Sequence, residues 1–134
     1  MTIDPSTVTA GGRIRDGGAP ESERTYAMFN HMVGLISMLE WVTSVMSIVA
    51  TGVMWLIRRH RSAFLDDHGK EALNFQLSLL AYFLLGVVLS PIGIGVLIMV
   101  LGVPLLRLVG CVRGAVAAYR GEFYRYPMCI RFVR

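Results

Sequence analysis

The distribution of apolar positions in the second half of the chain predicts two membrane-spanning helices. Residues 72–106 contain no charged side chain, and Pro91, Gly93 and Gly95 lie near the middle of this run. A single bilayer-spanning helix needs about 20 apolar residues at roughly 1.5 Å each, so the run is too long for one span. A turn at the Pro/Gly break gives two antiparallel helices of suitable length, with a bend expected near Pro104.

A first apolar block covers residues 26–57 and is compatible with two topologies. As one helix it would be about 48 Å long, well over a hydrocarbon core of about 30 Å. A long tilted span starting near Met32 would place the N-terminus outside, whereas a helical hairpin turning around Glu40 would place it inside. Glu40 is the only acid in the block, and a charge at a helix centre costs at least about 2.5 kcal/mol. That cost favours the hairpin.

The flanking segments complete the prediction of an all-α integral membrane helical bundle of about four short transmembrane helices, with three as the alternative. Residues 1–21, rich in Gly, Thr, Ser and Pro, are expected to form a disordered tail, and residues 22–134 the multi-pass domain. Ser22 is a candidate N-cap of the first helix. Near the C-terminus aromatic and basic residues alternate, which is typical of the membrane interface. The expected contacts with lipid headgroups are Arg120, Tyr124, Arg125 and Tyr126.

Composition and charge support a membrane protein and predict its orientation. Apolar residues make up 54% of the chain and charged residues 16%, far from the average of soluble domains. Residues 1–25 carry three basic and four acidic side chains, whereas residues 58–134 carry ten basic and four acidic. By the positive-inside rule, the central loop beginning at Arg58 and the C-terminus are cytoplasmic. Orientation explains the basic excess, so no nucleic-acid partner is expected.

A polar cluster between the two apolar blocks is the first candidate site; it contains Asp66, Asp67, His68, Lys70 and Glu71. Hard metal ions prefer several oxygen ligands, and a His-x-x-Glu pair faces inward in some di-iron bundles. A full di-metal site needs a second such pair, which this chain lacks. The simpler interpretation is that Asp66 or Asp67 caps a helix that opens at His68 or Gly69.

Polar residues inside the apolar blocks form the second candidate group. Asn30 and His31 are costly in lipid unless paired, so we expect them to bond to another helix, with Asn74 or Gln76 as candidate partners. His31 and Glu40 are the intramembrane polar residues that a proton or ion relay would use. A further polar set, spaced by four residues on one face of the next helix, is Asn74, Ser78 and Tyr82.

The chain shows none of the local patterns that mark an enzyme. It has no nucleophile beside a base, no phosphate-cradling glycine loop and no cysteine spacing typical of a metal site. Cys111 and Cys129 are its only cysteines. We therefore expect no catalytic residues, no cofactor and no bound metal.

Three stretches resemble a known family: residues 23–28 (ERTYAM) with His31, residues 64–76 (FLDDHGKEALNFQ) and residues 121–127 (GEFYRYP). They resemble bacterial small multi-pass membrane proteins with a domain of unknown function, grouped with magnetosome proteins of the MamF/MmsF type. More distantly, the chain is similar to the chloroplast inner-envelope import component Tic, the twenty-kilodalton subunit. The resemblance covers about residues 22–134. It implies a bacterial inner-membrane protein with three or four spans.

The resemblance implies little about activity. The magnetosome relatives influence mineral crystal growth, and the chloroplast relative belongs to a preprotein translocon. It implies no catalytic residues. The best candidates for a shared role are the matched polar residues at the cytoplasmic end of the third helix, which together with Asp66 would face a partner: Asp67, His68, Lys70, Glu71, Asn74 and Gln76.

The sequence thus predicts a non-enzymatic inner-membrane scaffold or interaction protein that contacts membrane lipids and either a second copy or another membrane protein. The alternative is a subunit of a transport, channel or protein-translocation assembly, in which Glu40, His31, Asn74 and Gln76 line a polar path. A third hypothesis is a metal-handling protein that uses the loop at residues 66–71.

Overall fold

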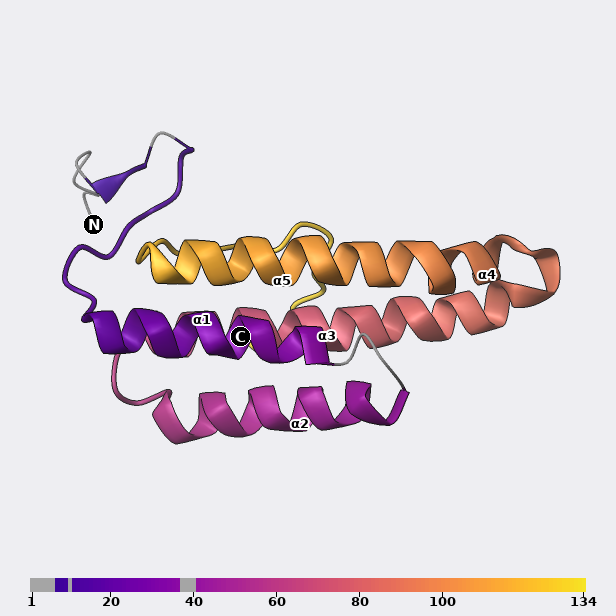
Figure 1. Cartoon of the computed structure of the whole chain (residues 1–134), viewed down its shortest axis with the longest axis horizontal. Coiled ribbons are helices and arrows are strands. Elements are labelled where there is room, and N and C mark those ends of the chain that lie inside the picture. Colours follow the sequence, from indigo (N-terminus) through magenta and orange to yellow (C-terminus); the bar gives the residue numbers. More distant parts are fainter. Residues whose placement is uncertain (1–6, 10, 37–40) are drawn as a thin grey trace.

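The protein folds as a bundle of antiparallel helices (Figure 1). The computed structural model describes residues 7–9, 11–36 and 41–134. In this part of the chain the regular elements are helices, and two isolated β-bridges join short stretches of the remainder. Helices α5 and α2 lie on opposite sides of the pair formed by α1 and α3. The bounds are α1 (Glu21–Ile36), α2 (Trp41–Arg58), α3 (Ala63–Leu89), a 3-10 turn η2 (Ser90–Ile92), α4 (Ile94–Leu97), a π-helical turn η3 (Ile98–Gly102) and α5 (Val103–Tyr119).

Two helices form the first apolar block. Helix α1 ends at Ile36, α2 begins at Trp41, and the two helices pack against each other (Figure 1). The prediction of a helical hairpin in this block is therefore confirmed, and the alternative of one long helix is wrong. Glu40, around which the turn was expected, lies outside the described residues.

Two helical segments are long and apolar enough to cross a membrane. They are Ala63–Ile92 and Ile94–Tyr119, with mean hydropathies of 1.9 and 2.3. The predicted turn between them is confirmed, with Pro91 inside η2 and Gly93 at a φ of 82° closing it. Helix α2 contributes a shorter apolar segment, Ser44–Arg58. Two of the four predicted spans thus meet the criterion of length and apolarity, and spanning by α1 and α2 stays a prediction.

The starts of the helices differ from the sequence prediction. Helix α3 begins at Ala63 because Ser62 caps it: the Ser62 hydroxyl oxygen accepts a hydrogen bond of 3.2 Å from the Leu65 N–H. The prediction that Asp66 or Asp67 caps this helix is therefore wrong. Ser22 is not an N-cap either, because it lies inside the first turn of α1.

One end of the bundle gathers the start of α1, the end of α2, the start of α3 and the end of α5; we call it the charged end (Figure 1, left). The basic loop that begins at Arg58 lies here. Residues 13–16, from the segment expected to be disordered, lie beside residues 121–123 through a β-bridge between Arg15 and Glu122. The Arg13 guanidinium also lies 3.2 Å from the Glu122 carboxylate.

The bundle exposes many large apolar side chains, and its interior holds polar side chains beside an apolar core that includes Phe64, Phe75 and Leu79. Many large apolar side chains of the long hairpin are exposed, among them Val88, Ile92, Leu97 and Leu105. Buried polar residues include Asn30, His31, Ser47, Thr51, His68, Glu71, Asn74, Gln76 and Ser78. An apolar exterior of this extent requires an apolar solvent, so the arrangement agrees with a bundle placed in lipid.

Candidate functional site

A row of polar side chains on one face of α3 binds the end of the chain. This polar stripe consists of Asp67, Glu71, Asn74, Ser78 and Tyr82, whose spacing of three or four residues places them on one helix face. After α5 the chain turns back, and residues 120–134, the C-terminal tail, return along this face. Each residue of the polar stripe bonds to the tail.

Asn74 makes three of these bonds. Its side-chain oxygen accepts hydrogen bonds from the N–H groups of Phe132 and Val133, at 3.0 and 2.8 Å. Its side-chain nitrogen donates to the Val133 carbonyl at 2.8 Å. One amide side chain thus replaces the partners that a neighbouring strand would offer to the tail.

Ser78 and Tyr82 continue the row toward the α3–α4 turn. The Ser78 hydroxyl oxygen accepts a hydrogen bond of 2.8 Å from the Ile130 N–H, and the Tyr82 hydroxyl donates to the Met128 carbonyl. Non-helical backbone is stable at membrane depth only where the protein satisfies its polar groups. The polar stripe does this for the tail.

Two carboxylates of the polar stripe pair with arginines of the tail. The Arg125 guanidinium donates two hydrogen bonds of 2.6 Å to the Asp67 carboxylate, and this pairing raises the pKa of Arg125 above its ordinary value. The Nε of Arg131 donates to Glu71 at 2.9 Å. Glu71 is buried, so its charge is compensated by a tail residue more than fifty positions away in the sequence.

A buried chain of hydrogen bonds links α1, α3 and the tail through two histidines. The Tyr126 hydroxyl lies 2.7 Å from Nδ1 of His31, Nε2 of His31 lies 2.7 Å from Nδ1 of His68, and Nε2 of His68 lies 3.1 Å from the Glu122 carbonyl. A carbonyl only accepts, so Nε2 of His68 must donate and its Nδ1 must accept. Nε2 of neutral His31 therefore donates to Nδ1 of His68, and the Tyr126 hydroxyl donates to Nδ1 of His31. Every hydrogen bond of the buried chain is thus donated in the direction of Glu122.

Replacing Tyr126 by phenylalanine is expected to lower the free energy of unfolding by about 1–3 kcal/mol, because the buried Nδ1 of His31 loses its donor. Thermal unfolding of the purified protein in detergent micelles measures this. Tyr119→Phe is the matched control, because Tyr119 is exposed. An equal loss in both variants would contradict the buried chain.

The remaining matched residues join α3 to α2. Gln76 bonds to the hydroxyls of Ser47 and Thr51, and all three side chains are buried. Nearer the charged end, the Trp55 ring N–H donates to Asp66 at 2.8 Å, and Lys70 lies 2.7 Å from the same carboxylate. Helix α3 therefore holds the neighbouring helix on one face and the tail on another.

These contacts correct part of the predicted partner-facing site. His68, Glu71, Asn74 and Gln76 are buried, because their polar groups are bonded within the chain. The prediction that these four residues face a partner is wrong. Asp66, Asp67 and Lys70 are about a quarter to a third exposed and take part in ion pairs within the chain.

Of the four predicted lipid contacts, two side chains are buried and two are exposed. Tyr124 and Tyr126 are buried in the core, where the Tyr126 ring stacks on Phe75 with centroids 3.9 Å apart, so their side chains are not on the surface that lipid headgroups could contact. Arg120 is exposed at the charged end, and Arg125 is exposed but paired with Asp67.

The predicted intramembrane partners are different from those observed. His31 does bond across helices, to His68 and to Tyr126 of the tail and not to Asn74 or Gln76. Asn30 is buried too, but its side-chain oxygen has no hydrogen-bond partner. His31 bonds to His68 and Tyr126, Asn74 to the last residues of the tail, and Gln76 to α2, so these described side chains are engaged separately and no hydrogen bond joins them in a row. Glu40 lies outside the described residues.

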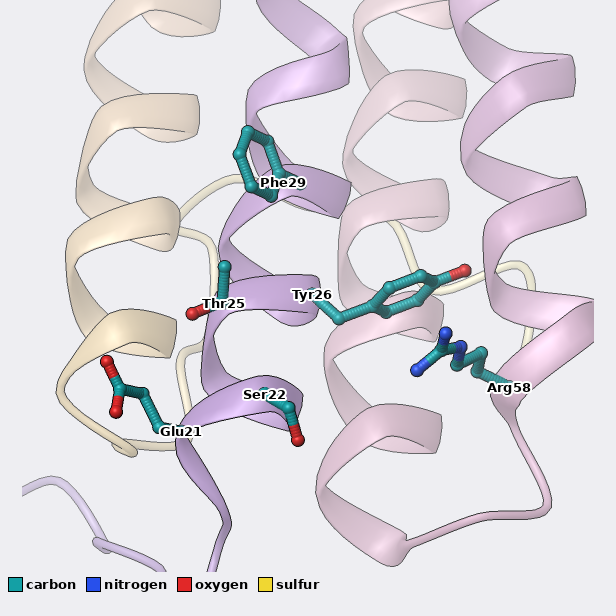
Figure 2. Close-up of a pocket in the computed structure, with 6 residues that line it drawn as sticks. All are labelled: Glu21, Ser22, Thr25, Tyr26, Phe29 and Arg58. Carbon is teal, nitrogen blue, oxygen red and sulfur yellow. The ribbon is translucent and has the colours of Figure 1, made fainter.

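A groove opens at the charged end between α1 and α2 (Figure 2). Its volume is about 490 Å³, and its lining combines charged, hydroxyl and aromatic side chains: Glu21, Ser22, Thr25, Tyr26, Phe29 and Arg58. The Arg58 guanidinium lies over the Tyr26 ring, 4.5 Å from its centroid, and the Tyr26 hydroxyl donates to the Met54 carbonyl. The groove thus presents a cation stacked on Tyr26 and, further along α1, the exposed ring of Phe29 (Figure 2).

In the part of the chain that the structure describes, no three His, Cys, Asp or Glu side chains are grouped so that they could hold a metal ion. In the loop proposed to handle metal, Asp66 bonds to Lys70 and Trp55, Asp67 to Arg125, and Glu71 to Arg131. These carboxylates are already engaged by cations and donors.

The apolar exterior and the two long apolar helices define a helical membrane protein in which polar residues of α3 bind the C-terminal tail. The model of the magnetosome magnetite crystal formation protein family (MamF/MmsF) matches residues 22–133, so the chain belongs to this family. No curated protein and no solved structure matches the chain. The similarity to the chloroplast import component stays a prediction.

Proposed function

We propose that the protein is a non-enzymatic membrane scaffold that takes part in magnetite crystal formation. One observation carries the scaffold role: the buried polar residues of the family-matched motif are bonded within the chain. A transport path or an active site needs polar groups that are open to a substrate, and these groups hold helices and tail together instead. The proposed role in magnetite crystal formation rests on the family match.

The pairing of the acidic side chains argues against direct contact with mineral. Asp66, Asp67, Glu71 and Glu122 each form an ion pair with a lysine or arginine of the chain. The proposed scaffold therefore acts through the membrane and a protein partner. A partner with an acidic surface suits the basic loop at the charged end, which begins at Arg58. The positive-inside rule puts this end on the cytoplasmic side of the inner membrane, or of a compartment derived from it.

Complementation tests the proposal. The chain is expressed in a magnetite-forming bacterium that lacks its own member of the family, and crystal diameter is measured by electron microscopy. We expect the wild-type chain to restore crystal diameter, and Arg58→Glu to fail although it reaches the membrane in equal amount. Arg134→Glu, with the same charge change on an exposed residue of the tail, should restore it.

Two outcomes would overturn parts of the proposal. A wild-type chain that inserts but restores nothing would contradict the role in crystal formation. Restoration by Arg58→Glu would contradict the charged end as the partner surface. Ion flux through liposomes is the second readout: the scaffold should leave them as tight as empty ones, whereas flux would favour a conducting subunit.

A further inference from the structure

We infer that the C-terminal tail is a re-entrant segment: it enters the hydrocarbon region beside α3 and presents its outer face to lipid acyl chains. The depth follows from where the tail turns. Met128, with a φ of 57°, marks the turn, and its carbonyl bonds to Tyr82. The charge-free run begins at Ala72, so Tyr82 lies ten residues, or about 15 Å, further along the helix. That is about half of a hydrocarbon core of about 30 Å.

Between residues 128 and 132 of the tail, apolar side chains that point outward alternate with side chains that contact α3, which suits a segment in contact with lipid. Met128, Ile130 and Phe132 point outward, with 69%, 45% and 55% of their surface exposed. The intervening residues turn toward α3: Cys129 lies near the Ser78 hydroxyl and Arg131 bonds to Glu71. In an extended segment successive side chains point to opposite sides. A tail in water would bury its apolar side chains, whereas Met128, Ile130 and Phe132 are exposed here.

Several main-chain polar groups of residues 128–133 have hydrogen-bond partners on α3, and the one charged side chain among these residues, Arg131, has a counter-ion. Asn74, Ser78 and Tyr82 bond to main-chain groups at the turn and after it, which lipid could not do. Arg131 is paired with Glu71, at the level where the charge-free run begins, so its long side chain stays near the interface.

Acyl chains are the occupant that fits the outer face. Exposed apolar side chains continue from the tail onto the neighbouring hairpin, for instance Leu84 and Leu85 of α3, which belong to a candidate span. The surface is therefore part of the same apolar exterior as the spans. A protein partner or a second copy would instead cover it and exclude lipid.

Spin labels test the inference in the full-length protein. Cys129→Ser removes the half-buried thiol, Cys111 stays because it is buried, and single cysteines are introduced by Ile130→Cys and Phe132→Cys. Arg120→Cys at the charged end is the control. After labelling in detergent and reconstitution into phosphatidylcholine vesicles, collision of each label with oxygen and with a water-soluble nickel chelate is measured by electron paramagnetic resonance.

We expect the labels at 130 and 132 to collide more with oxygen than with the nickel chelate, and the label at 120 to show the reverse. Labels at 130 and 132 that meet the chelate as often as the label at 120 would show that the tail lies in water. Labels that meet neither agent would show that protein covers the tail. Either result overturns the inference. If Ile130→Cys does not fold, Met128→Cys probes the deepest point, because Met128 marks the turn and is 69% exposed.

Discussion

Replacing Asn74 by leucine is expected to detach the end of the C-terminal tail and to lower the free energy of unfolding by about 3 kcal/mol. The substitution removes three hydrogen bonds to the main chain of Phe132 and Val133, each worth about 1 kcal/mol. It also leaves two N–H groups and a carbonyl without partners in an apolar environment, which adds to the cost. Unfolding in detergent micelles by increasing SDS, followed by tryptophan fluorescence, measures the loss.

The other polar-stripe residues provide a graded control. Tyr82→Phe removes one hydrogen bond to the Met128 carbonyl, so a loss of about 1 kcal/mol is expected. Carboxypeptidase should shorten the tail of Asn74→Leu faster than that of Tyr82→Phe, because Asn74 holds the last residues. Equal digestion of both variants and of wild type would show that Asn74 does not hold the tail.

Gly95→Ala is expected to be the most destabilising of the glycine substitutions in the long hairpin, with a loss of about 3 kcal/mol or more. A methyl group at position 95 would collide with the carbonyl oxygen of Gly86, with the Ser90 nitrogen and with the Leu89 carbonyl carbon. All three are backbone atoms, so no side chain can rotate away and the crossing of α3 and α4 must open. The fraction of folded protein after reconstitution, measured with SDS unfolding, gives the effect.

Gly102→Ala in the same helical segment is the matched control. Its methyl group would meet only the Ile98 side chain, at 4.0 Å, so stability should be unchanged or higher by up to about 1 kcal/mol. A loss as large for Gly102→Ala as for Gly95→Ala would mean that helix propensity, and not the close crossing, sets the result.

The overall helix pattern could be predicted because lipid imposes a simple length rule. The charge-free run and its Pro91 break gave the long hairpin, and the length of the first apolar block together with the cost of Glu40 gave the short one. The shared face of Asn74, Ser78 and Tyr82 also followed from spacing alone. Helix starts were less predictable, because Ser62 competes with the acidic residues nearby for the role of cap.

The partners of the polar residues could not be predicted, because they come from the far end of the sequence. His31 and His68 stand in separate matched stretches, and the tail residue Tyr126 completes their chain only in three dimensions. The Arg/aromatic alternation of the tail suggested the membrane interface, since nothing local shows that Tyr126 stacks on Phe75.

The position of the last residues has a consequence for how the protein is made. Residues 120–134 are translated after α3 and α5, so the polar face of α3 remains without its backbone partners until they have been synthesised. Insertion of the helices and closure of the bundle are therefore separate events in time. A fusion protein or affinity tag attached after Arg134 would begin two residues after Val133, which Asn74 anchors against α3. Tags for purification or microscopy belong at the N-terminus of this chain.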